Sequence, residues 1–213
     1  MTLKIFFLAI MSVCSLATLS QTKTYFEGTI TYKFSFEAKE IPDPGKSLTP
    51  YFGEGSTLFF KEGNYRHEYH GGLIEYDVYN KKDNKMYLKK RNNDTLYWRD
   101  CSLREDSIKN LLFDPKADTV MGITCDRLLI QYRGNSEIHY YNSDSIRINP
   151  IWFENFKLND EYLIDRKEKS IFLKSVTLFD HFTLIETAIK INSEPISIDK
   201  FKLPVNAILA AEE

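Results

Sequence analysis

The feature that most constrains this chain is an alternation of apolar and polar residues that recurs along much of its length. In the segment from Tyr25 to Ala38, Gly28 and apolar side chains occupy every second position, with Glu, Thr, Lys and Ser between them. Successive side chains of a β-strand point to opposite faces of a sheet, so this segment predicts a long strand with one dry and one wet face. The alternation therefore predicts a mainly β protein.

Shorter alternating segments follow between residues 56 and 99, separated by turn-forming residues such as Gly71-Gly72 and Asn92-Asn93-Asp94. Further predicted strands cover residues 118–132, 136–141, 161–166, 171–182 and 183–191. This spacing is typical of an antiparallel meander, here with about 10–11 strands. A sheet of that size with one apolar face twists and curls, so we expect a strongly curved half-barrel.

Three segments break the alternation. Residues 39–55 carry Pro42, Pro44 and Pro50 and predict a long loop or an edge crossing. Residues 102–113 predict a short helix with Ser102 and Glu105 as a capping box, ended by Asp114-Pro115. Residues 150–158 begin with Asn149-Pro150 and contain several aromatic side chains, which predicts a short helix or a crossing segment that covers the sheet.

The first 20 residues read as a secretory signal, with Lys4 preceding an apolar run from Ile5 to Cys14. We expect cleavage before Gln21, a single β-rich domain over residues 21–213, and a periplasmic or secreted location. The alternative is an uncleaved anchor or a buried N-terminal helix. Lipid anchoring through Cys14 is disfavoured, because Val13 stands where a lipoprotein signal needs a small residue.

The composition limits the classes of partner that we expect for this chain. The chain holds 28 basic and 30 acidic residues, a net charge of −2, so it lacks the basic excess of a nucleic-acid binder. No later apolar run reaches the roughly 18 residues that a membrane helix needs. We therefore expect no nucleic-acid partner and no membrane span in the mature chain.

Two cysteines follow the signal, Cys101 and Cys125. A pair of thiols in an exported chain favours one disulfide, which would contribute about 3 kcal/mol by closing its loop. Two unpaired, buried thiols are the alternative.

No catalytic or metal-binding motif is apparent. His67 and His70 lie three apart in a predicted strand, on opposite faces, and neither a nucleophile elbow nor a CxxC pair is present. The sequence gives no catalytic residues, no metal ligands and no cofactor, and we expect a protein that is not an enzyme.

Four short motifs resemble those of a known group of proteins. They are Phe26-Glu27-Gly28-Thr29-Ile30-Thr31-Tyr32, Gly63-Asn64-Tyr65-Arg66, Val120-Met121-Gly122-Ile123-Thr124-Cys125 and Phe201-Lys202-Leu203-Pro204. In this order the chain resembles small exported β-rich proteins of Bacteroidetes-type bacteria, which are similar to the lipoprotein-carrier (LolA/LolB-like) half-barrel superfamily. The resemblance implies a curved antiparallel sheet closed by helices over an apolar cavity, which takes acyl chains in the carriers. It does not extend to a carrier's functional arginine or protruding loop.

Aromatic side chains are the remaining functional signal. The candidates for a ligand cavity are Phe26, Tyr32, Phe34, Phe36, Trp98, Trp152, Phe153 and Phe156. They could simply fill a large core, or they could line a cavity for a lipid-like molecule beneath residues 152–156. The predicted function is an exported cell-envelope protein that binds a hydrophobic, lipid-like or acyl-like ligand. The alternative is a structural or interaction protein of the envelope that pairs with a partner through its sheet edge.

Overall fold

The computed structural model describes residues 25–38, 40–104, 108–133 and 136–212. Within these ranges the chain forms one mixed sheet in the order β12-β6-β5-β4-β3-β2-β1-β11-β10-β9-β8-β7. The strands are β1 (Gly28–Glu37), β2 (Gly55–Lys61), β3 (Asn64–Tyr69), β4 (Ile74–Asn80), β5 (Lys85–Lys90), β6 (Thr95–Asp100), β7 (Ile108–Val120), β8 (Ile123–Tyr132), β9 (Glu137–Arg147), β10 (Ser170–Leu178), β11 (Thr183–Asn192) and β12 (Ile208–Ala211).

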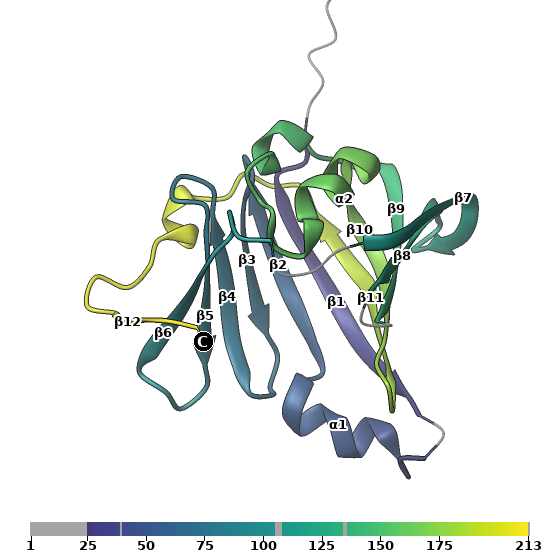
Figure 1. Ribbon diagram of the computed structural model, residues 1–213, viewed down its shortest axis with the longest axis horizontal. Helices are drawn as coiled ribbons and strands as arrows, with labels where there is room; N and C mark the ends of the chain where they lie inside the picture. The colour runs from purple at the N-terminus through teal and green to yellow at the C-terminus, as the bar shows by residue number, and fades with distance from the viewer. Residues whose placement is uncertain (1–24, 39, 105–107, 134–135, 213) are drawn as a thin grey trace, which may run out of the picture.

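The sheet is curved but not closed, because β12 and β7 remain as its two edges (Figure 1). Neighbouring strands pair antiparallel except β12, which runs parallel to β6. The predicted mainly β half-barrel is therefore confirmed, and the alternating segments at β1 to β6 form the strands that they predict.

The proline-rich segment forms a helix rather than a loop. Helix α1 (Pro44–Phe52) starts with Pro44 in its first turn, and the Asp43 carboxylate accepts a hydrogen bond from the Lys46 backbone nitrogen at 3.3 Å. Proline is favoured at the start of a helix, where its missing N–H would have no partner. The loop prediction is wrong because it treats each proline only as a breaker.

The helix predicted at residues 102–113 is also wrong. Strand β7 covers most of this region and continues through Asp114 and Pro115 as one arm of a hairpin with β8. An edge strand tolerates proline, and here the ladder shifts register between Asp114 and Asp118. Glu105, the expected second member of the capping box, lies outside the described residues.

The segment after β9 folds over the sheet in three short pieces (Figure 1). They are η1 (Pro150–Phe153), η2 (Leu158–Asp160) and helix α2 (Glu161–Glu168). The helical crossing predicted over residues 150–158 is thus confirmed at η1, whereas the strand predicted at residues 161–166 is wrong. We call residues 150–168 the cover segment.

The two faces of the sheet are covered by different parts of the chain. Leu58 and Phe60 of β2 pack with the cover segment in the main core, whereas Phe59 between them points to the opposite face. There it packs with a second core around Phe201 of η3 (Ile198–Phe201). The alternation of β2 therefore separates an inner face beneath the cover segment from an outer face beneath the C-terminal segment.

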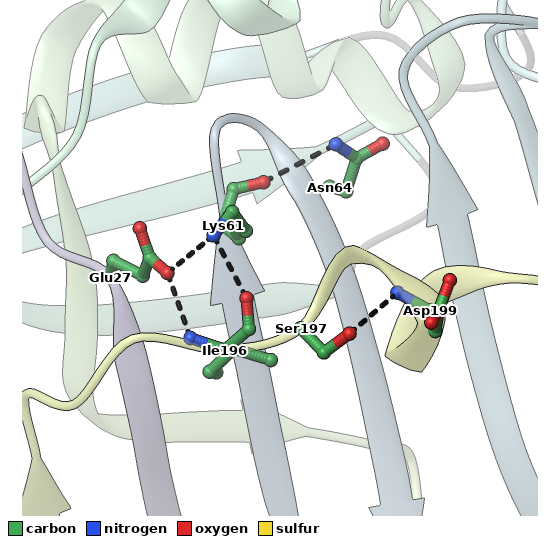
Figure 2. Close-up of polar contacts among 6 residues, drawn as sticks. All are labelled: Glu27, Lys61, Asn64, Ile196, Ser197 and Asp199. Carbon is green, nitrogen blue, oxygen red and sulfur yellow. Dashed lines mark hydrogen bonds and ion pairs between the residues drawn. The ribbon is translucent and has the colours of Figure 1, made fainter.

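The C-terminal segment is fixed to the outer face by a partly buried polar contact (Figure 2). The Lys61 amino group donates to the Glu27 carboxylate at 2.7 Å and to the Ile196 carbonyl at 2.8 Å. The Ile196 backbone nitrogen in turn donates to Glu27 at 2.8 Å. From this anchor the chain continues through η3 to β12 at the sheet edge (Figure 1).

The predicted signal segment, including Cys14, lies outside the described residues. In the described part of the chain, no helix has the length and apolar character needed to cross a membrane.

Candidate functional site

A cavity of about 220 Å³ lies between the inner face of the sheet and the cover segment. Its apolar lining comes from both sides and consists of Leu58, Phe60, Met86, Ile148, Phe153, Phe156, Leu158, Ile164, Ile171 and Phe172. The volume is below the roughly 300–1,000 Å³ of drug-sized ligand sites. A cavity of this volume would admit a compact molecule or a single chain rather than a bulky molecule.

One wall of the cavity is acidic. Helix α2 contributes Glu161, Asp165 and Glu168 to the lining, at positions i, i+4 and i+7. This spacing places the three carboxyl groups on one helix face. Asp165 is only 7% exposed, and Glu161 and Glu168 are half-buried. The helix therefore turns an acidic stripe towards the protein interior, and we call these three residues the acidic wall.

Burial shifts the titration of all three groups towards the neutral form. Loss of solvation raises the pKa of Glu161 to about 7. It raises the pKa of Glu168 to about 8, with a further contribution from Asp126 on β8. The pKa of Asp165 rises well above its usual value through burial and through the neighbouring Glu161 and Glu168. Burial disfavours a charged carboxylate that has no compensating partner.

Asp160, in the same segment, is a buried carboxylate whose charge is compensated by an ion pair and a hydrogen bond. It is fully buried, and the Arg104 guanidinium lies 2.7 Å from one carboxylate oxygen. The other oxygen accepts from the Ile108 backbone nitrogen at 3.0 Å. Asp160 thus fixes the start of α2 to the chain around β7, whereas no basic side chain of the described residues forms an ion pair with the acidic wall.

Asn142 on β9 contributes an amide to the cavity. It is 4% exposed, and neither its side-chain oxygen nor its nitrogen has a hydrogen-bond partner among the described residues. Leaving a buried polar group unpaired costs about 1–3 kcal/mol. The cavity lining therefore contains an unpaired buried amide in addition to the acidic wall.

Strand β3 supplies a third polar element through His67. Its imidazole lies 3.4 Å from the Asp77 carboxylate, which also accepts a hydrogen bond from the Tyr69 hydroxyl at 2.7 Å. Burial alone would lower the pKa of His67, but Asp77 outweighs it and the pKa is raised. His67 therefore has its own counter-ion and does not neutralise the acidic wall.

The structure places the predicted aromatic residues in several different surroundings. Phe153 and Phe156 are part of the lining of the cavity. Phe26, Tyr32 and Phe34 are buried in the main core and do not line it.

Phe36 packs against Phe52 of α1, with ring centres 5.7 Å apart. Trp98 lies in the second core on the outer face, so the prediction that it lines the cavity is wrong. The prediction fails because alternation separates the two faces of β6 but does not say which one is inner.

Trp152 anchors the cover segment rather than lining the cavity. Its ring lies 5.3 Å from that of Tyr25 and 6.1 Å from that of Phe60. Gly63 in the β2–β3 turn has φ +82°, and a Cβ atom there would lie 2.5 Å from the Trp152 Cβ. Glycine at this turn thus lets the tryptophan approach the backbone closely.

The predicted disulfide is absent, because Cys101 and Cys125 are both free and buried. Cys101 follows β6 and its backbone contacts Asn84, Lys157 and Leu158. Cys125 lies in β8, which stands next to the opposite edge of the sheet. Both thiols belong to the main core, and burial raises the pKa of both.

The acidic wall is the part of the site that sequence reasoning missed. The strand predicted over residues 161–166 places Glu161 and Asp165 on one face but ends before Glu168 and forms no stripe with it. The usable signal was Asp160-Glu161 preceding an apolar pair with basic residues at the end, which favours a helix start. Within the described ranges, no group of three or more His, Cys, Asp or Glu side chains is arranged to hold a metal ion.

Comparisons with known proteins add little. No protein-family model matches the chain, and no curated protein matches it in sequence. Among solved structures, it is similar to the crystal structure of an uncharacterized conserved protein from Thermus thermophilus. The TM-score is 0.45 at 8% identity, over 87% of this chain and 91% of that chain. A likeness of this size carries no argument about family or function.

Proposed function

We propose that this protein is an exported cell-envelope protein that binds a small hydrophobic, lipid-like molecule in the cavity beneath the cover segment. The observation that supports the proposal is a cavity of about 220 Å³ whose apolar lining comes from both the sheet and the cover segment. Burying apolar groups in such a site favours binding by about 0.8 kcal/mol per methylene. The resemblance to lipoprotein-carrier half-barrels points to the same class of ligand.

A fluorescence titration with N-phenyl-1-naphthylamine, a neutral apolar probe, tests the proposal on the purified chain. We expect saturable binding and displacement by linear C6 to C14 alcohols. Affinity should rise about fourfold per methylene and then level off when the cavity is full. Native mass spectrometry of the freshly purified protein should show a bound small molecule that organic solvent extracts.

A matched pair of variants locates the binding. Ile164 lines the cavity, so Ile164→Phe should fill part of it and weaken probe binding about tenfold. Ile189 is 55% exposed, so Ile189→Phe should leave binding unchanged. Absence of saturable binding to the natural chain, or equal binding by both variants when both are folded, would overturn the proposal.

A second candidate function rests on β7. This edge strand pairs only with β8 among the described strands, and it exposes Leu112 by 57% and Phe113 by 51%. An open apolar edge can accept a strand of another protein. We propose envelope-protein docking there as the alternative function.

Affinity capture from envelope extracts tests the alternative. A stable complex that Phe113→Lys abolishes supports docking at β7, with Val205→Lys on the fully exposed part of the C-terminal segment as the control. A complex that survives Phe113→Lys, or no complex at all, contradicts it.

A further inference from the structure

The acidic wall of the cavity is costly unless something outside the described residues compensates it. Three carboxyl groups of α2 face a lining that is otherwise largely apolar. Like charges at i and i+4 on a helix destabilise it, and burial without a counter-ion adds a larger penalty. Leucine or isoleucine at these positions would be enough for a cavity that binds only apolar groups. The acidic wall therefore indicates a binding partner that compensates its buried carboxyl groups.

An unpaired polar side chain outside the stripe, Asn142, points to the same conclusion independently. Asn142 enters the cavity from β9, a different element from α2, with both polar side-chain atoms unpartnered in the described structure. Asp165 is 7% exposed, and its Oδ2 atom also has no hydrogen-bond partner there. Native proteins pair most buried polar groups, so these atoms mark places where a ligand group or ordered water binds.

The charges around the cavity define the sign of that ligand group. His67 is the basic residue of the lining, and it is already paired with Asp77. Arg166 and Lys167 on α2 are exposed to solvent, and Lys167 offsets only part of the upward shift in the pKa of Glu168.

Other titratable groups near the acidic wall carry no positive charge. They include Tyr65 on β3, Tyr79 on β4, Cys101 after β6, Asp126 on β8 and Tyr140 on β9. Arg104, beside the start of α2, is already paired with Asp160. The remaining groups are neutral or acidic, so the surroundings favour a cation.

We propose that the ligand is a cationic amphiphile, with a protonated amine against Glu161, Asp165 and Glu168 and an apolar chain along Phe60, Phe153 and Phe156. This inference rests on the proposed function and specifies the chemistry of its ligand. An ammonium group carries three N–H donors, and a hydrogen bond from it to a carboxylate is charge-assisted. The oxygen of the Asn142 amide can accept a further hydrogen bond from the head group.

The mechanism of recognition includes a proton. Without a bound amine, the Glu168 carboxyl and a large fraction of the Glu161 carboxyl groups are protonated at neutral pH, because burial raises the pKa of both. An ammonium group brought against them favours the carboxylate form. The carboxyl proton then leaves to the solvent as the amine binds, so affinity should increase between about pH 6 and pH 8.

Three probes with the same C12 chain test the sign of the head group. We measure displacement of N-phenyl-1-naphthylamine at pH 7.5 by dodecylamine, dodecanol and dodecanoate, all below their aggregation concentrations. Dodecylamine should bind at least tenfold more tightly than dodecanol, and dodecanoate should bind most weakly. Butylamine separates an amphiphile from a free amine, and it should compete only at concentrations at least a hundredfold higher.

Variants of the acidic wall assign the effect to its residues. Asp165→Asn and Glu168→Gln keep the size of the side chains and should each weaken dodecylamine binding about tenfold, with dodecanol unchanged within twofold. Glu154→Gln on the exposed side of the cover segment is the matched control and should change neither. Calorimetry in buffers of different ionisation enthalpy should show proton release on amine binding that Glu168→Gln reduces.

The outcomes separate the inference from the function beneath it. If dodecanol binds as tightly as dodecylamine, or if dodecanoate binds more tightly, the proposal of a cationic ligand is wrong. The proposal of an apolar binding cavity would still hold. Butylamine binding as well as dodecylamine would replace the amphiphile by a small amine. If none of the C12 probes displaces the dye, the proposed function itself fails.

Discussion

Replacing Glu168 by glutamine should change how the stability of this protein depends on pH. Burial raises the pKa of Glu168 from 4.5 to about 8, with Asp126 adding to the effect. In the unfolded chain the same carboxyl titrates near its ordinary value. Between these two pH values the folded protein holds one proton that the unfolded protein has released. The stability contributed by this group is therefore present below about pH 4.5 and is lost as the pH rises towards 8.

The size of the effect follows from the shift. One extra proton in the folded state gives a slope of about −1.4 kcal/mol per pH unit, and the whole shift corresponds to about 5 kcal/mol. Glu168 keeps part of its surface accessible, so solvent screening reduces this ceiling, and we expect about 2–3 kcal/mol. Glu168→Gln cannot ionise, so the variant should match the natural protein near pH 5 and exceed it by about 2–3 kcal/mol at pH 9.

Urea unfolding at pH 5, 6, 7, 8 and 9, followed by circular dichroism, measures this difference. Glu154→Gln removes an exposed carboxyl from the same segment and should leave the pH dependence of the natural protein unchanged. If Glu168→Gln shows the same fall in unfolding free energy between pH 5 and pH 9 as the natural protein, Glu168 does not titrate in a buried site, and the reasoning on the acidic wall is refuted.

Three further predictions test other parts of the structure. Gly63→Ala should destabilise the protein by about 1–3 kcal/mol in urea unfolding, because it combines a positive φ with a clash against Trp152, and an unchanged midpoint would contradict this. A thiol assay on unreduced protein expressed without residues 1–20 should find two reactive groups, Cys101 and Cys125, in guanidinium and almost none in the native state, whereas finding none in guanidinium would show a disulfide. Lys61→Met should cost about 1–3 kcal/mol and speed proteolysis of the C-terminal segment, and equal cleavage rates in the two proteins would exclude the anchor of Figure 2.

Much of the sheet could be predicted because period-two alternation acts locally. β1 and the meander from β2 to β6 alternate apolar and polar residues and have clear turn residues between strands. The failures occur where local patterns compete. Pro44 starts α1, and Pro115 lies in an edge strand at a register shift, so neither proline acts as the breaker that the sequence suggested.

The site was less predictable because it depends on which residues the curvature brings together. Phe153 and Phe156 could be found from the aromatic cover segment alone. Asn142, His67 and Asp165 come from β9, β3 and α2, and no spacing in the sequence reports that they share a cavity. The sequence predicted an apolar interior, whereas the inner face combines an apolar lining with carboxyl groups that have no counter-ion among the described residues.

Methyl NMR on titration with dodecylamine tests the central claim most directly, because it reports where the ligand lies. We expect chemical-shift changes at the methyl groups of Met86, Ile148 and Ile164, which line the cavity. Changes confined to exposed methyl groups such as Leu112 on β7 and Leu209 on β12, with the cavity signals unmoved, would contradict it.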